Sequence, residues 1–144
     1  RKQTLLRLHS LETQPSCAFL AQVFAILSHH AVAVDLVTTS ENCIALALDA
    51  THATSGEDHI LTTALFTALS SHCRVEVETG LALVTLVGNQ LTQAAGVCKD
   101  VFAWLEEHTV RMICHGASND NLCILLPADA ADSAIKTLHY RLFE

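Results

Sequence analysis

A ten-residue stretch occurs twice in this chain, and the repeat limits the folds that the chain can adopt. Residues 23–32 read VFAILSHHAV and residues 101–110 read VFAWLEEHTV, so six of the ten positions are identical at an offset of 78. In a chain of 144 residues this offset indicates two tandem copies of one small unit. A unit of that size buries only a marginal core, so we expect the copies to support each other or a second chain.

The overall composition excludes several classes of protein. Hydrophobic residues make up 51% of the chain, which is typical of a folded domain and not of a disordered one. No apolar run approaches the roughly 18 residues that a membrane helix needs, so we expect no membrane association. A net charge of −7 with only 5% aromatic residues argues against nucleic acid as a partner.

The start of the chain and its cysteines bear on its origin. No signal peptide is visible and there is no initiator Met, so we expect a cytoplasmic fragment of a longer protein. The six cysteines include no C-x-x-C pair and the nine histidines no H-E-x-x-H motif. The sequence therefore predicts reduced thiols, no metal site, no cofactor and no catalytic residues within this chain.

Hydrophobic spacing in the first copy predicts the order strand, helix, strand, strand, helix, strand. Ser16 is the expected N-cap of the first helix and Asp58 that of the second. The expected strands are 4–11, 33–38, 43–49 and 74–78. The residues expected to face inward are Leu6, Leu8, Phe19, Val23, Ile26, Leu27, Ile44, Leu46, Leu48, Ile60, Leu61, Ala64, Leu65, Ala68, Leu69, Val75 and Val77.

The second copy repeats this order but stops after its second helix. Strands are expected at 81–87, 109–114 and 122–126, with helices at 96–108 and 129–142. The predicted fold class is α+β, with two tandem ferredoxin-like βαββαβ units at residues 1–79 and 80–144. Because the second unit lacks its last strand, its sheet edge needs either a strand from upstream of Arg1 or another partner.

The two copies differ in charge after the first helix. The first copy carries Asp35, Thr39 and Glu41, whereas the second has Ile113, Ala117 and Asn119 at the equivalent positions. A carboxylate within an apolar strand needs a structural donor or a cationic ligand. We expect the start of the first helix, a potential anion site, to lie near both carboxylates. That combination suits a zwitterionic amino acid.

Three segments carry a resemblance to a known family. Residues 19–24 (FLAQVF), 34–41 (VDLVTTSE) and 111–118 (RMICHGAS) are similar to the tandem ACT domains of lysine-sensitive aspartate kinases, as are residues 138–144. The resemblance covers essentially the whole chain, and the 34–41 stretch is its most specific part.

The resemblance implies a regulatory role in a larger enzyme. Family members phosphorylate aspartate with ATP and Mg in an upstream kinase domain, and their ACT pair binds lysine to feedback-inhibit lysine biosynthesis. Lysine is expected between the first ACT domains of a homodimer, while the second ACT domain is structural and is completed by a strand from before the first. The implied lysine contacts are Ser16, Ala18, Phe19, Leu20, Val34, Asp35, Thr39, Ser40 and Glu41.

Two departures from the family pattern leave alternatives open. Ala18 stands where the family has Gly, although the second copy keeps Gly96 there, and Pro15 stands where some relatives have His. The chain could therefore be an ACT dimerisation module that has lost amino-acid binding, or one that responds to another effector such as threonine.

Overall fold

The computed structural model describes residues 2–11, 16–50 and 61–143. The chain divides into two compact units, with the boundary between Thr79 and Gly80. The first unit comprises residues 3–79 and the second residues 80–143 together with Lys2. Each unit is described by itself below.

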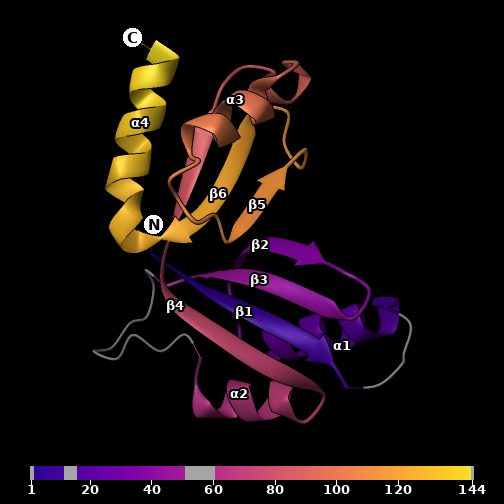
Figure 1. The fold of residues 1–144 in the computed structure, drawn as a ribbon. Coiled ribbons are helices and arrows are strands. Elements are labelled where there is room, and N and C mark those ends of the chain that lie inside the picture. Colours follow the sequence, from indigo (N-terminus) through magenta and orange to yellow (C-terminus); the bar gives the residue numbers. More distant parts are fainter. Residues whose placement is uncertain (1, 12–15, 51–60, 144) are drawn as a thin grey trace. The chain divides into compact units, whose positions relative to one another are not determined.

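The first unit is a four-stranded antiparallel sheet with two helices (Figure 1). Its elements are β1 (Lys2–Ser10), α1 (Ser16–His29), β2 (Val34–Thr39), β3 (Cys43–Asp49), α2 (Thr63–Ser70) and the first part of β4 (Cys73–Val87). The strand order is β2-β3-β1-β4, so β2 lies at one edge. The predicted βαββαβ order of a ferredoxin-like α+β unit is confirmed.

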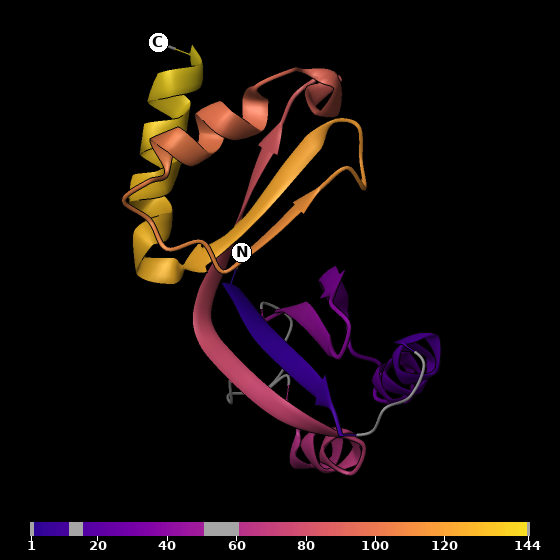
Figure 2. The same ribbon diagram turned by 45° about the vertical axis from the view of Figure 1, so that its right-hand side comes forward.

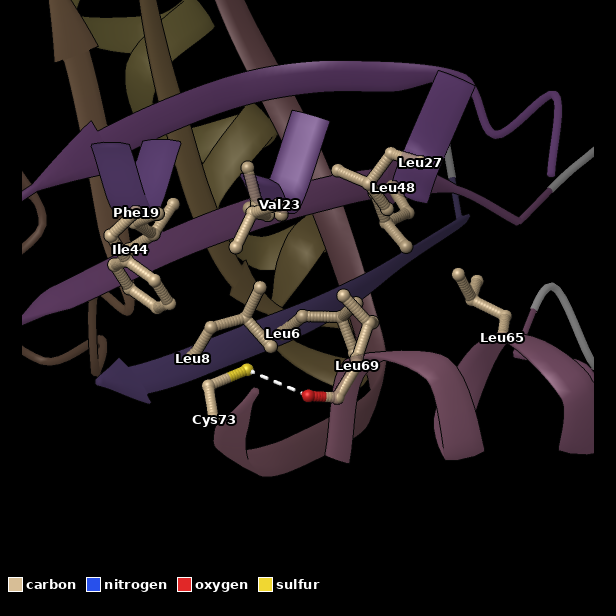
Figure 3. Packing of buried hydrophobic residues seen from close by; sticks show 11 residues of the cluster. Leu6, Leu8, Phe19, Val23, Leu27, Ile44, Leu48, Leu65, Leu69 and Cys73 are labelled. Carbon is tan, nitrogen blue, oxygen red and sulfur yellow. Dashed lines mark hydrogen bonds between the residues drawn. The ribbon is translucent and has the colours of Figure 1, made fainter. Parts of the chain in front are cut away.

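One apolar cluster fills the space between the helices and this sheet (Figure 3). Large residues alternate with small ones in β3, so Ile44, Leu46 and Leu48 all point toward the helices. They pack with Leu6, Leu8, Phe19, Val23, Leu27, Leu65, Leu69 and Cys73, every one of them at most 3% exposed. The period of 3.6 in α1 brings Phe19, Val23 and Leu27 onto one face, as the sequence predicts.

The second helix of this unit begins later than the sequence predicts. Thr62 caps α2, its hydroxyl accepting the Leu65 amide at 3.2 Å. The expected cap Asp58 and the expected core residue Ile60 lie outside the described residues. Ala64, predicted to face inward, is exposed. Two plausible N-cap residues, Asp58 and Thr62, precede the same apolar pattern, and local spacing does not choose between them.

The second unit has a three-stranded sheet in the described residues. Residues 81–87 of β4 pair with β6 (Asn121–Pro127), which pairs with β5 (Met112–His115). Its helices are α3 (Val97–Trp104) and α4 (Ala131–Phe143), with short 3-10 turns η1 (Leu91–Gln93) and η2 (Ala128–Ala130). Both α3 and α4 lie on the same side of the sheet (Figure 2), and the cluster that they cover includes Val101, Leu105, Ile124 and Leu138.

The fourth strand differs from the prediction because it is not two strands. β4 runs for 15 residues from Cys73 to Val87, through Gly80, which has a φ of +71°. The sequence predicts a strand ending at Glu78 and another starting at Leu81. Glycine adopts a left-handed φ without steric cost, so the strand continues through this residue. Val77, predicted to face inward, is 44% exposed in this strand.

Two further elements are shorter than expected. α3 ends at Trp104 and not at His108, and β5 begins at Met112 and not at Thr109. No helix in the described parts of the chain is long and apolar enough to cross a membrane.

Candidate functional site

Asp35 lies in an irregular part of the edge strand β2. Val34 pairs with Leu48 and Leu36 pairs with Ala47, so the register shifts by one residue at Asp35. This bulge turns the carboxylate away from the core that Val34 packs against. Asp35 is exposed, and its Oδ2 accepts a hydrogen bond of 2.7 Å from the side-chain amide of Gln3 on β1. The Asp35 carboxylate is therefore held from within its own unit.

Thr39, Ser40 and Glu41 lie at the opposite end of β2. Thr39 pairs with Ile44 at the end of the ladder, and the Ser40 amide donates to the Cys43 carbonyl at 2.9 Å. All three residues are exposed. The tight connection from β2 to β3 thus presents two hydroxyls and one carboxylate to solvent.

The start of α1 supplies the third part of the candidate site. Ser16 and Ala18 are exposed, Phe19 is 3% exposed in the core, and Leu20 is partly buried against the same core. The helix begins at Ser16, so the predicted cap residue lies just inside the helix, within the usual uncertainty of helix ends. Pro15 lies outside the described residues. The first turn of α1 offers backbone N–H groups that no residue of the helix itself can satisfy.

The structure divides these residues between the two ends of β2. Asp35 follows α1 closely, because only four residues separate His29 from Val34. Ser16 is at the other end of a helix of 14 residues, about 21 Å long. Phe19 lies beside Ile44, and hence near Thr39, whereas Leu27 lies beside Leu48 (Figure 3). The expectation that the helix start lies near both carboxylates of one copy is therefore wrong.

The residues at the two ends of β2 offer different binding groups that complement each other. The helix start and the β2–β3 connection combine N–H donors, hydroxyls and the Glu41 carboxylate. The other end of β2 offers the Asp35 carboxylate beside Val34. Thr39 is four positions along the strand from Asp35, which corresponds to about 13 Å. The first group could hold a carboxylate and an ammonium, and the second could hold a further ammonium.

Metal binding and thiol chemistry find no constellation near this site. Among the described residues, no group of three or more His, Cys, Asp or Glu side chains could hold a metal ion. All six cysteines are free thiols. Cys73 is buried in the core, and burial raises the pKa of its thiol to about 11.

One residue at the site was not found from the sequence. Gln3 is 1% exposed and donates to Asp35, 32 residues away. It lies on β1, with β3 between it and β2. Because the contact depends on the order of strands and on the bulge at Asp35, no spacing in the sequence signals it.

Comparisons with known proteins agree with this fold. The ACT-domain family model matches residues 84–142, which is most of the second unit. The lysine-sensitive aspartokinase 3 of Escherichia coli is 55% identical over all 144 residues. The chain spans 32% of the length of that relative.

The similar solved structures are also aspartokinases. A crystal structure of E. coli aspartokinase III with aspartate and ADP, in the R-state, matches the whole chain with a TM-score of 0.93 at 55% identity and is covered to 32%. A second structure of aspartokinase III, with lysine and aspartate in the T-state, matches with a TM-score of 0.84 at 53% identity and the same coverage. The chain belongs to the ACT-domain regulatory regions of the aspartokinase family.

Proposed function

We propose that this chain is the lysine sensor of an aspartate kinase. The observation that carries the proposal is the pair of exposed carboxylates, Asp35 and Glu41, which lie at opposite ends of β2 in the first unit and are replaced by Ile113 and Asn119 in the second. Two carboxylates suit a ligand with two ammonium groups. Lysine at neutral pH has two, whereas threonine and methionine have one.

The separation of the two groups supports a site built by two copies. The 13 Å or so between Asp35 and Thr39 is more than an extended lysine molecule spans. β2 is an edge strand, and a two-fold axis at Val37 would pair β2 with its copy in antiparallel register. Asp35 of one copy would then lie opposite Thr39 of the other, since isologous contacts are reciprocal. Lysine would complete two such sites per dimer.

Each predicted contact has a role in this arrangement. The N–H groups at Ser16 and Ala18 receive the ligand carboxylate, and Thr39, Ser40 and Glu41 receive one ammonium. Asp35 and Val34 of the second copy receive the other ammonium and the aliphatic chain. The partly buried Leu20 provides an apolar wall between them, and Phe19, whose side chain is buried in the core, contributes its backbone.

The proposal extends to the larger protein. The parent chain would carry a kinase domain that phosphorylates aspartate, which the name aspartokinase and the aspartate and ADP bound in one relative support. We propose in addition that this kinase uses ATP and Mg and works in the cytoplasm. Lysine would inhibit it by binding one arrangement of the subunits more tightly than another. A coupling of about 1–3 kcal/mol is typical of such regulation.

Calorimetric titration tests the effector. The 144-residue chain is titrated with lysine, threonine and methionine, and then as Asp35→Asn and Glu41→Gln. We expect lysine alone to bind, and each variant to weaken its binding by at least about tenfold, because each leaves an ammonium without its charged partner. Glu107→Gln, which removes an exposed carboxylate of the second unit, is the control and keeps the parent affinity.

Two outcomes would contradict the proposal. Absence of binding heat with lysine at millimolar concentrations would favour a dimerisation module without a ligand, for which Ala18 and Pro15 are the sequence arguments. Heat with threonine instead of lysine would assign the site to another effector.

A further inference from the structure

Gln3 is a buried amide with one partner and one unsatisfied atom. Its side chain is 1% exposed, its Nε2 donates to Asp35 Oδ2 at 2.7 Å, and its buried Oε1 has no hydrogen-bond partner among the residues that the structure describes. A buried acceptor without a donor costs free energy. An apolar side chain would avoid that cost, so the stability of the unit does not account for Gln3.

The geometry of the sheet explains how the two side chains meet. Gln3 on β1 is opposite Asp49 on β3. On the other side of β3, Val34 pairs with Leu48 and Leu36 with Ala47, so Asp35 has no partner residue of its own in this ladder. Strand β3, which lies between β1 and β2 in the sheet, therefore separates Gln3 from Asp35. Gln3 points to the face away from the helices, since it alternates with the inward-facing Leu6 and Leu8. The hydrogen bond crosses β3 on that face, and the small Ala47 side chain leaves room for it.

The effect on Asp35 is to fix an exposed carboxylate. Without Gln3, an aspartate on an exposed edge strand would sample several rotamers. With Oδ2 held, Oδ1 remains the acceptor for a ligand, since in the described part of the chain Gln3 is the hydrogen-bond partner recorded for this carboxylate. A group that is already ordered loses less conformational entropy when it binds.

We propose that Gln3 is a positioning residue for the ligand ammonium, acting through Asp35. The inference rests on the proposed function, in which Asp35 receives an ammonium of lysine. Gln3 sets the orientation of the carboxylate before the ligand arrives. Its unsatisfied Oε1 is the stability cost that accompanies this arrangement.

The test begins with the free protein. Three-bond couplings of the Asp35 β-protons, measured by NMR without ligand, report whether χ1 is fixed. We expect two unequal couplings in the parent chain and averaged couplings in Gln3→Met, which keeps the side-chain volume but has no donor. Averaged couplings already in the parent chain would overturn the inference, whatever lysine does.

The second readout is a pair of measurements that move in opposite directions. Gln3→Met should bind lysine about 3- to 10-fold more weakly by calorimetry, while its melting temperature stays equal or rises because the unsatisfied acceptor is gone. A purely structural role predicts a lower melting temperature and unchanged affinity, and that result would overturn the proposal. Gln22→Met is the matched control, since Gln22 contacts His72 at 2.8 Å in the same unit.

A double variant separates this inference from the proposed function. If Gln3 acts through Asp35, Gln3→Met should weaken lysine binding no further in an Asp35→Asn background. Additive losses would mean that Gln3 acts on the ligand by another route. If the parent chain binds no lysine, the proposed function fails, and the NMR couplings still decide whether Gln3 orders Asp35.

Discussion

At the scale of single residues, burial decides how the thiols behave. Cys73 is 1% exposed, its Sγ donates to the Leu69 carbonyl at 3.2 Å, and desolvation raises the pKa of the thiol from 9.0 to about 11. Cys43 is half-buried, and burial followed by the charge of Glu76 also raises its pKa. Both thiols are therefore harder to ionise in the folded chain than in the unfolded chain.

The Cys73 thiol should make stability fall in alkaline solution. Between pH 9 and about pH 11 the unfolded chain loses this proton while the folded chain keeps it, so stability is fully present below pH 9 and declines above it. The expected loss is about 2–3 kcal/mol across that window. Urea unfolding of the parent chain and of Cys73→Ala at pH 8, 9 and 10 measures it, and the Cys73→Ala curve should be flatter.

A truncation without a titrating group provides the control for this prediction. Val23→Ala removes core volume from the same cluster, so it should lower stability by a similar amount at every pH. If the stability of Cys73→Ala and that of Val23→Ala both fall with pH as steeply as the stability of the parent chain, the buried thiol is not the cause of the alkaline loss.

At the scale of elements, strong alternation was predictable and ambiguous boundaries were not. β3 occupies Cys43–Asp49, the range that the large–small alternation predicts. α2 begins four residues later than expected from Asp58, since Thr62 provides an equally good cap. The sequence predicts two strands, one on each side of Gly80, because a glycine in a strand pattern often marks an interruption. Whether the strand continues or stops there depends on tertiary pairing, which local sequence does not contain.

Gly80, within β4, should be more sensitive to substitution than Gly88, which follows the end of that strand. A Cβ at this position would meet nothing within 4 Å, so the cost of Gly80→Ala comes from the φ of +71° alone. We expect a loss of about 1–2 kcal/mol in chemical unfolding. Gly88 does not have a left-handed φ, and a Cβ added at Gly88 would have the Leu91 Cδ1 as its nearest neighbour, at 3.4 Å.

Substitution by alanine should therefore destabilise the chain at Gly80 but not at Gly88. Gly88→Ala is expected to be neutral or stabilising by up to about 1 kcal/mol, since it mainly restricts the unfolded chain. Equal losses at Gly80 and Gly88 would mean that backbone conformation is not what fixes Gly80.

At the scale of the whole molecule, the repeat predicted the two-unit organisation, while the arrangement of the candidate site did not follow from it. The offset placed Asp35 and Glu41 in one segment, and proximity in sequence suggested one cluster. Strand geometry instead puts them at opposite ends of β2. The role of Gln3 could not be predicted from the sequence, because its contact with Asp35 crosses the intervening strand β3. Both the separation of Asp35 from Glu41 and the contact of Gln3 with Asp35 depend on strand positions that only the folded sheet defines.

The edge strand β2 predicts how copies of the chain associate. Val37 is 41% exposed at the middle of β2, and the proposed two-fold axis passes through it. We expect the parent chain to be a dimer by sedimentation equilibrium, and Val37→Lys to be a folded monomer, because two lysines at the axis would repel each other. The variant should also lose lysine binding, since each site needs two copies.

Val77→Lys is the matched control for this prediction. Val77 is 44% exposed on β4 in the same unit, so the variant introduces the same charge on another strand. It should remain dimeric and bind lysine. A dimeric Val37→Lys with normal affinity would show that the copies associate through another surface.

The continuous strand β4 has a consequence for anyone who dissects this protein. The boundary between the units falls between Thr79 and Gly80, in the interior of a strand and not in a linker. A cut at that boundary would leave a new strand terminus on both fragments. An excised first unit is better ended near Val87, and an excised second unit better begun near Cys73. The two minimal fragments would then overlap, each carrying its own copy of the shared strand.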